Sequence, residues 1–344
     1  MAIDLRTPLC HELGIEYPVL SVGFGSGARA ELVAAVSNAG GFGVLGASGV
    51  PPDAIRAESR RTRTLTDRPF GINLIIEEDP ANVDEDRRFI QEQIRAAMGE
   101  GAAAIVLFWG DPSPYVEEPH ANGVKVLIQV GSLEEARSAV EAGVDAVIAQ
   151  GIEAGGHVRG SIPIWELLPS TVEAIAPVPV IASGGIGDGA GLARALLAGA
   201  QGVSLGTRFV ASDEANVHPE YKRRIVSSVG ADTVYTADLY DVWWPDAPHR
   251  TLRNRTFDEW DAAGRPPSGA RPGEGTIVGT RTHVSGKRID WPRYAVGMIT
   301  PDFDGDIDYP PMWAGESCSV VDDVKPASEI VRDLVRDASA AIRG

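Results

Sequence analysis

The first two thirds of the chain contain eight short apolar runs that alternate with amphipathic segments. Each run is rich in Val and Ile and apolar throughout, which is typical of strands buried on both faces of a parallel sheet. The runs are PVLSV (18–22), GFGVL (41–45), FGINLII (70–76), AAIVLF (103–108), VKVLIQV (124–130), DAVIA (145–149), PVPVIAS (177–183) and GVSLG (202–206). The pattern therefore predicts eight parallel strands.

The segments between these runs have the length and composition of helices. They are rich in Ala, several end in Gly, and Ser132 and Asp188 stand where N-caps belong. The segments are 28–40, 84–101, 132–143, 162–176 and 188–200. Strands alternating with helices predict an α/β fold, a TIM (β/α)8 barrel that closes near residue 206, with a doubly wound open sheet as the alternative.

The composition changes after about residue 230. The stretch 239–279 concentrates Trp, Arg, Pro and Gly without a strand rhythm, and RPPSGARPGEG (265–275) has the composition of a loop. We expect three parts: a cofactor-binding barrel over 1–230, a lid or small subdomain over 231–325 that packs on one end of the barrel, and a closing helix within 326–344.

The charge and the cysteines exclude several classes of protein. There are 31 Lys and Arg against 48 Asp and Glu, a formal net charge of −17, which repels nucleic acid and anionic membranes. Cys10 and Cys318 lack the spacing of a disulfide framework or a thiolate metal site. With no basic stretch before an apolar run at the start and no long uncharged apolar run, we expect a cytoplasmic protein without a bound metal.

Two glycine-rich loops indicate a ligand with a phosphate. SGGIGDG (183–189) follows the seventh predicted strand and SLGTRF (204–209) follows the eighth. Glycine-rich backbone at such positions exposes N–H groups, and barrels often bind phosphate after strands seven and eight. One such loop alone could be a flexible turn, whereas two consecutive loops favour a phosphate-bearing cofactor.

Amide side chains stand at or near the ends of other predicted strands. Asn73 interrupts an apolar run, Gln129 ends the fifth strand, and Gln150 follows the sixth. A buried amide is costly unless it is hydrogen-bonded, so each of them either braces neighbouring loops or binds a ligand. A planar hydrogen-bonding ring with a phosphate tail would suit amides and the bare glycine backbone after the first strand.

Six motifs follow one another along the first two thirds of the chain: GIEYPVL (14–20), NAGGFGVLGA (38–47), PFGINLI (69–75), QGIEAGGH (150–157), VPVIASGGIGDG (178–189) and GVSLGTRF (202–209). In this order they resemble the nitronate monooxygenase family, also called 2-nitropropane dioxygenase-like proteins. The last third, in 252–267, 273–275 and 314–317, resembles the family less specifically. The resemblance implies an FMN-dependent TIM-barrel oxidoreductase.

The resemblance also implies roles for individual residues. The catalytic histidine falls on His157, and the FMN contacts fall on Val22, Gly23, Phe24, Asn73, Gln150, Gly155, Gly185, Ser204, Leu205, Gly206 and Thr207. The turn after the first strand departs from the family, because Phe24 stands where a Met is usual. This departure bears on the substrate pocket more than on the cofactor.

The reaction implied by the resemblance is the oxidative denitrification of alkyl nitronates or nitroalkanes, with O2, to a carbonyl compound and nitrite. His157 could bind the nitronate when protonated, or remove the α-proton of a nitroalkane when neutral. The alternative is an NAD(P)H-dependent flavin reductase acting on a quinone, an enoyl thioester or an acyl-CoA compound. A flavin-free barrel without activity is a third interpretation, and a homodimer stays open.

Further residues receive structural interpretations. Glu153 could brace its loop, and its carboxylate would raise the pKa of His157 if it lay close. Asp111 is interpreted as a helix cap rather than a substrate contact. The remaining histidines are expected in loops or at helix edges, as surface or structural residues, and three tryptophans are expected in the core of the C-terminal segment: His11, His120, His218, His249, His283, Trp243, Trp244 and Trp313.

Overall fold

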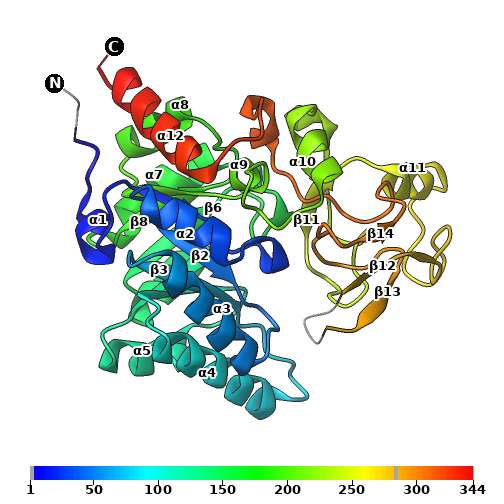
Figure 1. The fold of residues 1–344 in the computed structure, drawn as a ribbon, viewed down its shortest axis with the longest axis horizontal. Helices are drawn as coiled ribbons and strands as arrows, with labels where there is room; N and C mark the ends of the chain where they lie inside the picture. Colours follow the sequence, from blue (N-terminus) through cyan, green and yellow to red (C-terminus); the bar gives the residue numbers. More distant parts are fainter. Residues whose placement is uncertain (1–3, 283–285, 344) are drawn as a thin grey trace.

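The eight predicted strands form one parallel sheet that curls into a nearly closed barrel in the computed structural model, which describes residues 4–282 and 286–343 (Figure 1). The strand order is β1-β9-β8-β6-β5-β4-β3-β2, and a parallel bridge from Leu20 to Phe42 joins β1 to β2. The predicted TIM barrel is therefore confirmed. Its strands are β1 (Val19–Ser21), β2 (Gly43–Gly46), β3 (Phe70–Ile75), β4 (Ala104–Phe108), β5 (Lys125–Val130), β6 (Ala146–Gln150), β8 (Val180–Ser183) and β9 (Gly202–Leu205).

Helices cover the outside of the barrel between successive strands. The five predicted helices are present as α2 (Ala30–Asn38), α4 (Val83–Gly99), α6 (Leu133–Glu141), α7 (Ile164–Ile175) and α8 (Gly189–Leu197). Ser132 and Asp188 cap α6 and α8 as expected, since their side chains accept hydrogen bonds from the backbone of the first turn. The pattern missed α3 (Pro52–Leu65), a strongly charged helix, and the short α5 (Glu117–Ala121).

Residues along each strand alternate between two apolar clusters. Ala104 and Val106 of β4 face the barrel interior, together with apolar residues of α1 (Pro8–Leu13). Ile105 and Leu107 belong to the larger cluster between the strands and the surrounding helices. This double burial explains why the strands read as apolar throughout.

The described part of the C-terminal segment (231–325) contributes strands to two small antiparallel sheets beside the barrel, one of which also takes in a strand from the loop after β6. One contains β10 (Thr233–Thr236), β11 (His249–Leu252) and β7 (Gly156–His157), and the other contains β13 (Arg288–Pro292), β12 (Ile277–Thr282) and β14 (Asp304–Gly305). These strands correct the expectation of a segment without strands. Their pattern is hard to recognise because β11 is buried at every position, whereas β12 has no buried residue.

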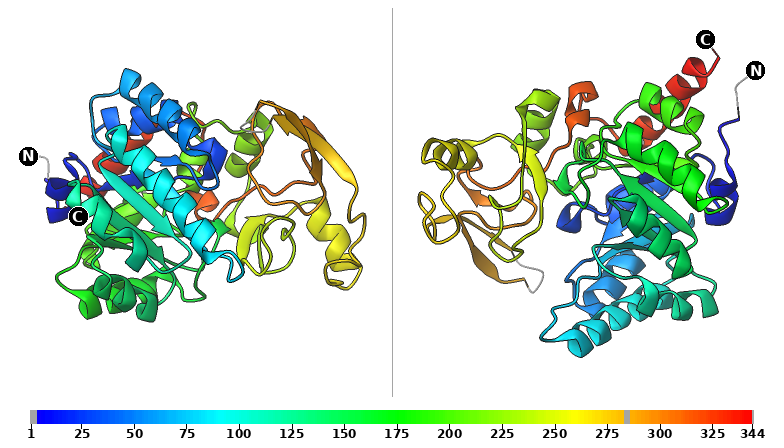
Figure 2. Two further views of the ribbon diagram at one scale, coloured as in Figure 1. Left: turned by 90° about the horizontal axis from the view of Figure 1, so that it is seen from below. Right: turned by 180° about the vertical axis from the view of Figure 1, so that it is seen from behind.

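The segment and α1 lie at opposite ends of the barrel in all three views (Figures 1 and 2). The segment also contains α11 (Arg255–Ala262), and the chain reaches it through α9 (Thr207–Val210) and α10 (Pro219–Val226). The chain then returns to the barrel, where α12 (Ala327–Ala341) packs on α8 and α2. Over the described ranges, we find no helix with the length and apolar character needed to span a membrane.

Candidate active site

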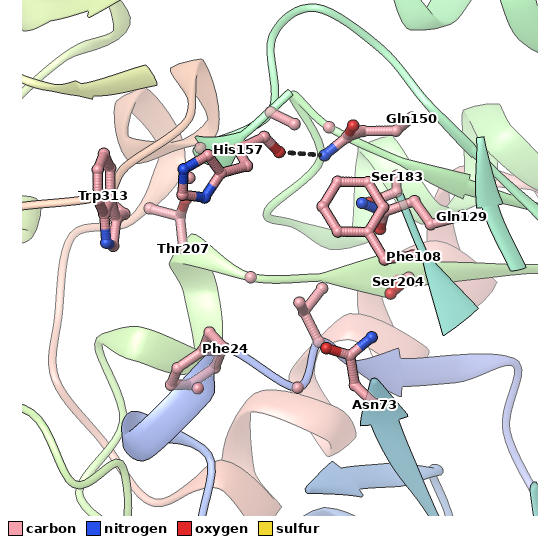
Figure 3. A pocket seen from close by; sticks show the side chains of 18 of the residues that line it. Phe24, Asn73, Phe108, Gln129, Gln150, His157, Ser183, Ser204, Thr207 and Trp313 are labelled. Carbon is pink, nitrogen blue, oxygen red and sulfur yellow. Dashed lines mark hydrogen bonds between the residues drawn. The ribbon is translucent and has the colours of Figure 1, made fainter. Parts of the chain in front are cut away.

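A cavity of about 310 Å³ opens at the carboxyl ends of the barrel strands, between the barrel and the C-terminal segment (Figure 3). Barrel residues from the ends of β1, β3, β5, β6, β8 and β9 line one side of it, and residues from the segment line the other. The structure brings His157 and all the predicted cofactor residues to this cavity except Leu205. Leu205 is buried in the cluster between strands and helices, so its side chain does not face the cavity.

Part of the barrel side of the cavity presents glycine backbone, beside larger side chains such as Phe24 and Phe108. A Cβ atom on Gly23 would lie 2.5 Å from Cβ of Asn73 and 2.7 Å from the carbonyl oxygen of Leu45, so this loop is packed as closely as glycine allows. At Gly206, by contrast, the nearest atom to an added Cβ would be Val22 Cγ2 at 3.9 Å. Gly185 adopts a φ of +68°, which L side chains rarely adopt.

The loops after β8 and β9 also leave backbone donors available. Among the hydrogen bonds of the described residues, none is donated by the N–H group of Gly185, Ile186, Gly206 or Thr207. The hydroxyl of Thr207 accepts a hydrogen bond from Gly315 N at 3.0 Å, which ties this loop to the C-terminal segment. Unpaired N–H groups on two adjacent loops are the donors that a phosphate group needs.

The amide side chains at the strand ends combine both roles that the sequence suggested. Gln150 donates to the carbonyl oxygen of His157 at 2.9 Å and accepts from Arg159 N at 2.9 Å, so it braces the loop after β6. Asn73 donates to the carbonyl oxygen of Val106 at 3.0 Å. Gln150, Asn73 and Gln129 also line the cavity, where they can contact a ligand (Figure 3).

His157 lies inside a cage of aromatic rings. Its imidazole is 3.9 Å from the indole of Trp244 and 5.4 Å from that of Trp313, measured between ring centroids. Trp109 and His249 approach with their rings nearly perpendicular, at 6.1 and 5.9 Å. The Nε2 atom of His157 is buried and has no hydrogen-bond partner. The residue is held in place because β7 pairs with β11, with His157 opposite His249.

This burial controls the protonation of His157. Desolvation, the larger cause, and the neighbouring His249 together lower its pKa from 6.5 to about 3. The carboxylate of Glu153 does not contribute to this shift, and it accepts hydrogen bonds from Ile164 N at 3.0 and 3.2 Å. Glu153 therefore braces its loop as expected, and His157 is neutral at pH 7.

The tryptophans differ from the expectation that all three form a core. Trp244 and Trp313 line the cavity, and Trp243 is 58% exposed. The reason is that the C-terminal segment lies over the cavity and turns part of its apolar face toward it. Sequence reasoning also missed Phe108, Val296 and other lining residues, namely Ser48, Ile75, Ala154, Val210, Gly297, Met298 and Ser317.

Some of the missed residues carry a signal in the sequence, and others carry none. Phe108 and Ile75 end predicted strands, so the barrel topology alone places them at the cavity. Val296 and its two neighbours have no such signal, because the chain reaches the cavity there through an irregular loop.

The remaining histidines are structural or on the surface. His249 is fully buried in β11 rather than in a loop, with Nδ1 2.9 Å from the carbonyl oxygen of Ala247 and Nε2 accepting from Tyr240 N at 3.2 Å. Of the others, His11 is exposed on α1, His120 pairs with Asp145, and His218 caps α10. His283 lies outside the described residues.

Two further interpretations concern acidic residues. Asp111 accepts hydrogen bonds from the backbone N and the hydroxyl of Ser113, at 2.9 and 2.6 Å, and so organises the turn that begins η2 (Ser113–Tyr115). Within the described part of the chain, no group of three or more His, Cys, Asp or Glu side chains is arranged to hold a metal ion.

Comparison with known proteins places nearly the whole chain in one family. Residues 6–337 match the family profile described as nitronate monooxygenase. A Mycobacterium tuberculosis protein named (3aS,4S,5R,7aS)-5-hydroxy-7a-methyl-1-oxo-octahydro-1H-indene-4-carboxyl-CoA dehydrogenase is 31% identical, with 97% of this chain and 96% of the relative covered. A nitronate monooxygenase of Paraburkholderia phytofirmans is 30% identical, with 96% and 94% covered.

A solved structure has the same fold over nearly the whole chain. FabK from Thermotoga maritima superimposes with a TM-score of 0.76 at 30% sequence identity, covering 98% of this chain and 97% of that one. The similarity therefore includes the C-terminal segment as well as the barrel.

Proposed function

We propose, from the premise that this chain belongs to the nitronate monooxygenase family, that it binds FMN in the cavity and oxidises alkyl nitronates or nitroalkanes with O2. As a member of this family it is a flavin-dependent oxidoreductase. The products of the proposed reaction are a carbonyl compound and nitrite. FMN, when bound, supplies the redox chemistry, whereas the protein binds the substrate, orients it and handles the proton.

The residues at the cavity fit FMN. The unpaired N–H groups of Gly185, Gly206 and Thr207 would hold the phosphate group. Asn73 and Gln150 would hold the ring system through their amides, since both line the same cavity beside bare glycine backbone. The fit rests on donors that have no partner within the protein and on space that no side chain fills.

The observation that carries the proposed reaction is the Nε2 atom of His157. It is buried at the cavity, has no partner, and belongs to an imidazole that is neutral at pH 7. A neutral imidazole can accept the α-proton of a nitroalkane: the C–H bond breaks, the Nε2–H bond forms, and the electron pair moves into the nitronate. The resulting imidazolium and nitronate attract each other, and this attraction raises the pKa of His157 when the substrate is present.

An acyl-CoA substrate is a second candidate, favoured by the 31% identity to a carboxyl-CoA dehydrogenase over 97% of this chain. The charge of the site disfavours an acyl-CoA substrate. No Lys or Arg is among the described residues that line the cavity, and the chain has a net charge of −17. The phosphate groups of coenzyme A would therefore find no cationic partner inside the cavity.

The test is the variant His157→Ala, assayed by nitrite release from nitroethane and from preformed ethyl nitronate. Loss of a general base should lower kcat/KM for nitroethane by roughly 10²–10⁴. The loss on ethyl nitronate should be smaller because its proton has already been removed, and the FMN content should not change. His120→Ala is the matched control, since His120 pairs with Asp145 on the surface. Unchanged kcat/KM for nitroethane in His157→Ala would contradict the role of His157.

A further inference from the structure

The indole of Trp244 joins the C-terminal segment to the barrel across the cavity. Its Nε1–H group donates to Oε2 of Glu77 at 2.5 Å, and Glu77 lies on the loop between β3 and α4. The same indole lies against the imidazole of His157, at 3.9 Å with an angle of 38° between the rings, and 5.2 Å from Trp109. One side chain thus contacts the proposed base and is held by the opposite wall.

The barrel side of this contact is firmly built. Glu78, which follows Glu77, accepts from Arg87 of α4 at 2.8 and 3.2 Å and from the hydroxyl of Tyr115 at 2.6 Å. The hydrogen bond from Arg87 also holds the pKa of Glu78 below its ordinary value, so this carboxylate stays charged. The loop is therefore fixed on two elements, and it presents the carboxylate of Glu77 at a defined place.

On the side of the C-terminal segment, hydrogen bonds hold the chain next to Trp244, but the backbone conformation there is unfavourable. The backbone N–H of Trp244 donates to the carbonyl oxygen of Asp241 at 3.0 Å, and the carboxylate of Asp241 accepts from the buried guanidinium of Arg271 at 2.6 Å. Trp243 and Asp246, on either side of Trp244, have φ values of +80° and +55°. Residues with a Cβ rarely adopt this region, and the cost must be offset by contacts such as the one with Glu77.

The other rings around His157 are held differently. Trp313 donates from Nε1 to the carbonyl oxygen of Gly297 at 2.8 Å, and its own carbonyl oxygen accepts from the hydroxyl of Tyr221 at 2.5 Å. Trp109 is 7% exposed and directly follows β4. Trp244 and Trp313 are both partly exposed, but only the side-chain hydrogen bond of Trp244, of these two, ends on a carboxylate from another region of the chain.

We propose that Trp244, positioned by Glu77, closes the site over His157 and restricts it to small substrates. Because Nε2 of His157 is buried and Trp244 covers one face of the ring, a bulky group on the substrate has no room there unless the indole moves. The substrate class is then short-chain nitro compounds without a bulky substituent. The statement on substrate size rests on the proposed function, whereas the statement on closure of His157 does not.

The first experiment measures access to His157 without using catalysis. The flavin-loaded protein is treated with diethyl pyrocarbonate, and carbethoxylation of each histidine is followed by peptide mass spectrometry. Trp244→Ala should increase the rate at His157 about tenfold or more, which corresponds to the loss of about 1.4 kcal/mol of protection. Glu77→Ala should give part of this increase, and Glu77→Gln should restore the slow rate because its amide oxygen can accept the same indole hydrogen.

Two controls separate closure from general loosening. Trp243→Ala removes an exposed indole next in sequence and should leave the rate at His157 unchanged. His249 is fully buried 5.9 Å from His157 and should stay unmodified in every variant. An unchanged rate at His157 in Trp244→Ala would overturn the proposal, and so would parallel modification of His249.

The second experiment measures substrate size. Trp244→Ala should raise kcat/KM for phenylnitromethane relative to nitroethane by about tenfold, a typical effect of pocket size. Glu77→Gln should keep the wild-type ratio. If the wild type turns over no nitro compound, the proposed function fails, while the carbethoxylation rates still decide the closure by Trp244. If nitro compounds are turned over and Trp244→Ala leaves the ratio unchanged, the size restriction is wrong.

Discussion

The two walls of the cavity are built in different ways. The barrel wall combines glycine backbone, unpaired N–H groups and amide side chains at strand ends with a few apolar side chains such as Phe24 and Phe108. The wall from the C-terminal segment consists of large apolar side chains, with Trp244 and Trp313 beside His157. Under the proposed function, the main chain of the barrel would hold the cofactor, whereas individual side chains of the segment would control the surroundings of His157.

The largest expected effect lies in the segment, at Arg271. Its buried guanidinium binds the carboxylate of Asp241 at 2.6 Å and that of Glu274, and it lies 4.3 Å from the ring of Tyr294. Arg271→Met leaves Asp241 without its partner and should lower the free energy of unfolding by about 3–5 kcal/mol. Urea denaturation measures this, with Arg265→Met as the control because Arg265 makes an exposed pair with Asp261. Equal destabilisation by the two variants would contradict the structural role of Arg271.

The next effect concerns pH and the cage around His157. Since the folded pKa of about 3 lies below the ordinary 6.5, the unfolded chain binds a proton between these values and the folded chain does not. The contribution of neutral His157 to the free energy of unfolding is therefore fully present above pH 6.5 and is lost as the pH falls toward 3. Between pH 7 and pH 4.5, the free energy of unfolding of the wild type should fall by roughly 2–3 kcal/mol more than that of His157→Gln, whose side chain does not titrate. A difference that stays constant over this range would show that the cage does not hold His157 neutral.

The smallest effect tests the barrel wall. In Gly206→Ala the new methyl group meets no protein atom nearer than 3.9 Å, so the stability of the fold should be unaffected. The methyl group should instead occupy space that the phosphate group of the cofactor would fill. Blocking one hydrogen bond to phosphate should weaken FMN binding about tenfold or more. Titration of the apoprotein, followed by quenching of FMN fluorescence, measures the Kd. The control is Gly99→Ala on α4, where an added Cβ meets no atom within 4 Å, and an equal Kd in both variants would place the phosphate elsewhere.

The barrel could be predicted because its strands are buried on both faces. That burial leaves runs such as AAIVLF that cannot be read as amphipathic helices. The helix α3 escaped prediction because its sequence is mostly polar or charged, and only Ile55, Ser59 and Thr62 are buried in it. Its place between β2 and β3 is fixed by the topology more than by its own pattern.

The same distinction applies to the site. The glycine loops follow β8 and β9 directly, and His157 lies at the far end of the loop after β6, so the sequence motifs could indicate all three places. The contact between Glu77 and Trp244 spans 167 positions and joins two irregular segments, so no periodic pattern indicates it. His249 could not be placed beside His157 either, because the pairing of β7 with β11 depends on how the C-terminal segment folds back.

The central claim is that this flavin-dependent enzyme oxidises nitronates. The most direct measurement is an anaerobic titration of the flavin-loaded protein, with the visible absorbance of the flavin followed during addition of propyl-2-nitronate in one cuvette and of NADH or NADPH in another. We predict that the nitronate alone reduces the flavin, and that a ketone and nitrite appear when oxygen is admitted. Reduction by the nicotinamide only, with no change on adding the nitronate, would contradict the claim and identify a reductase.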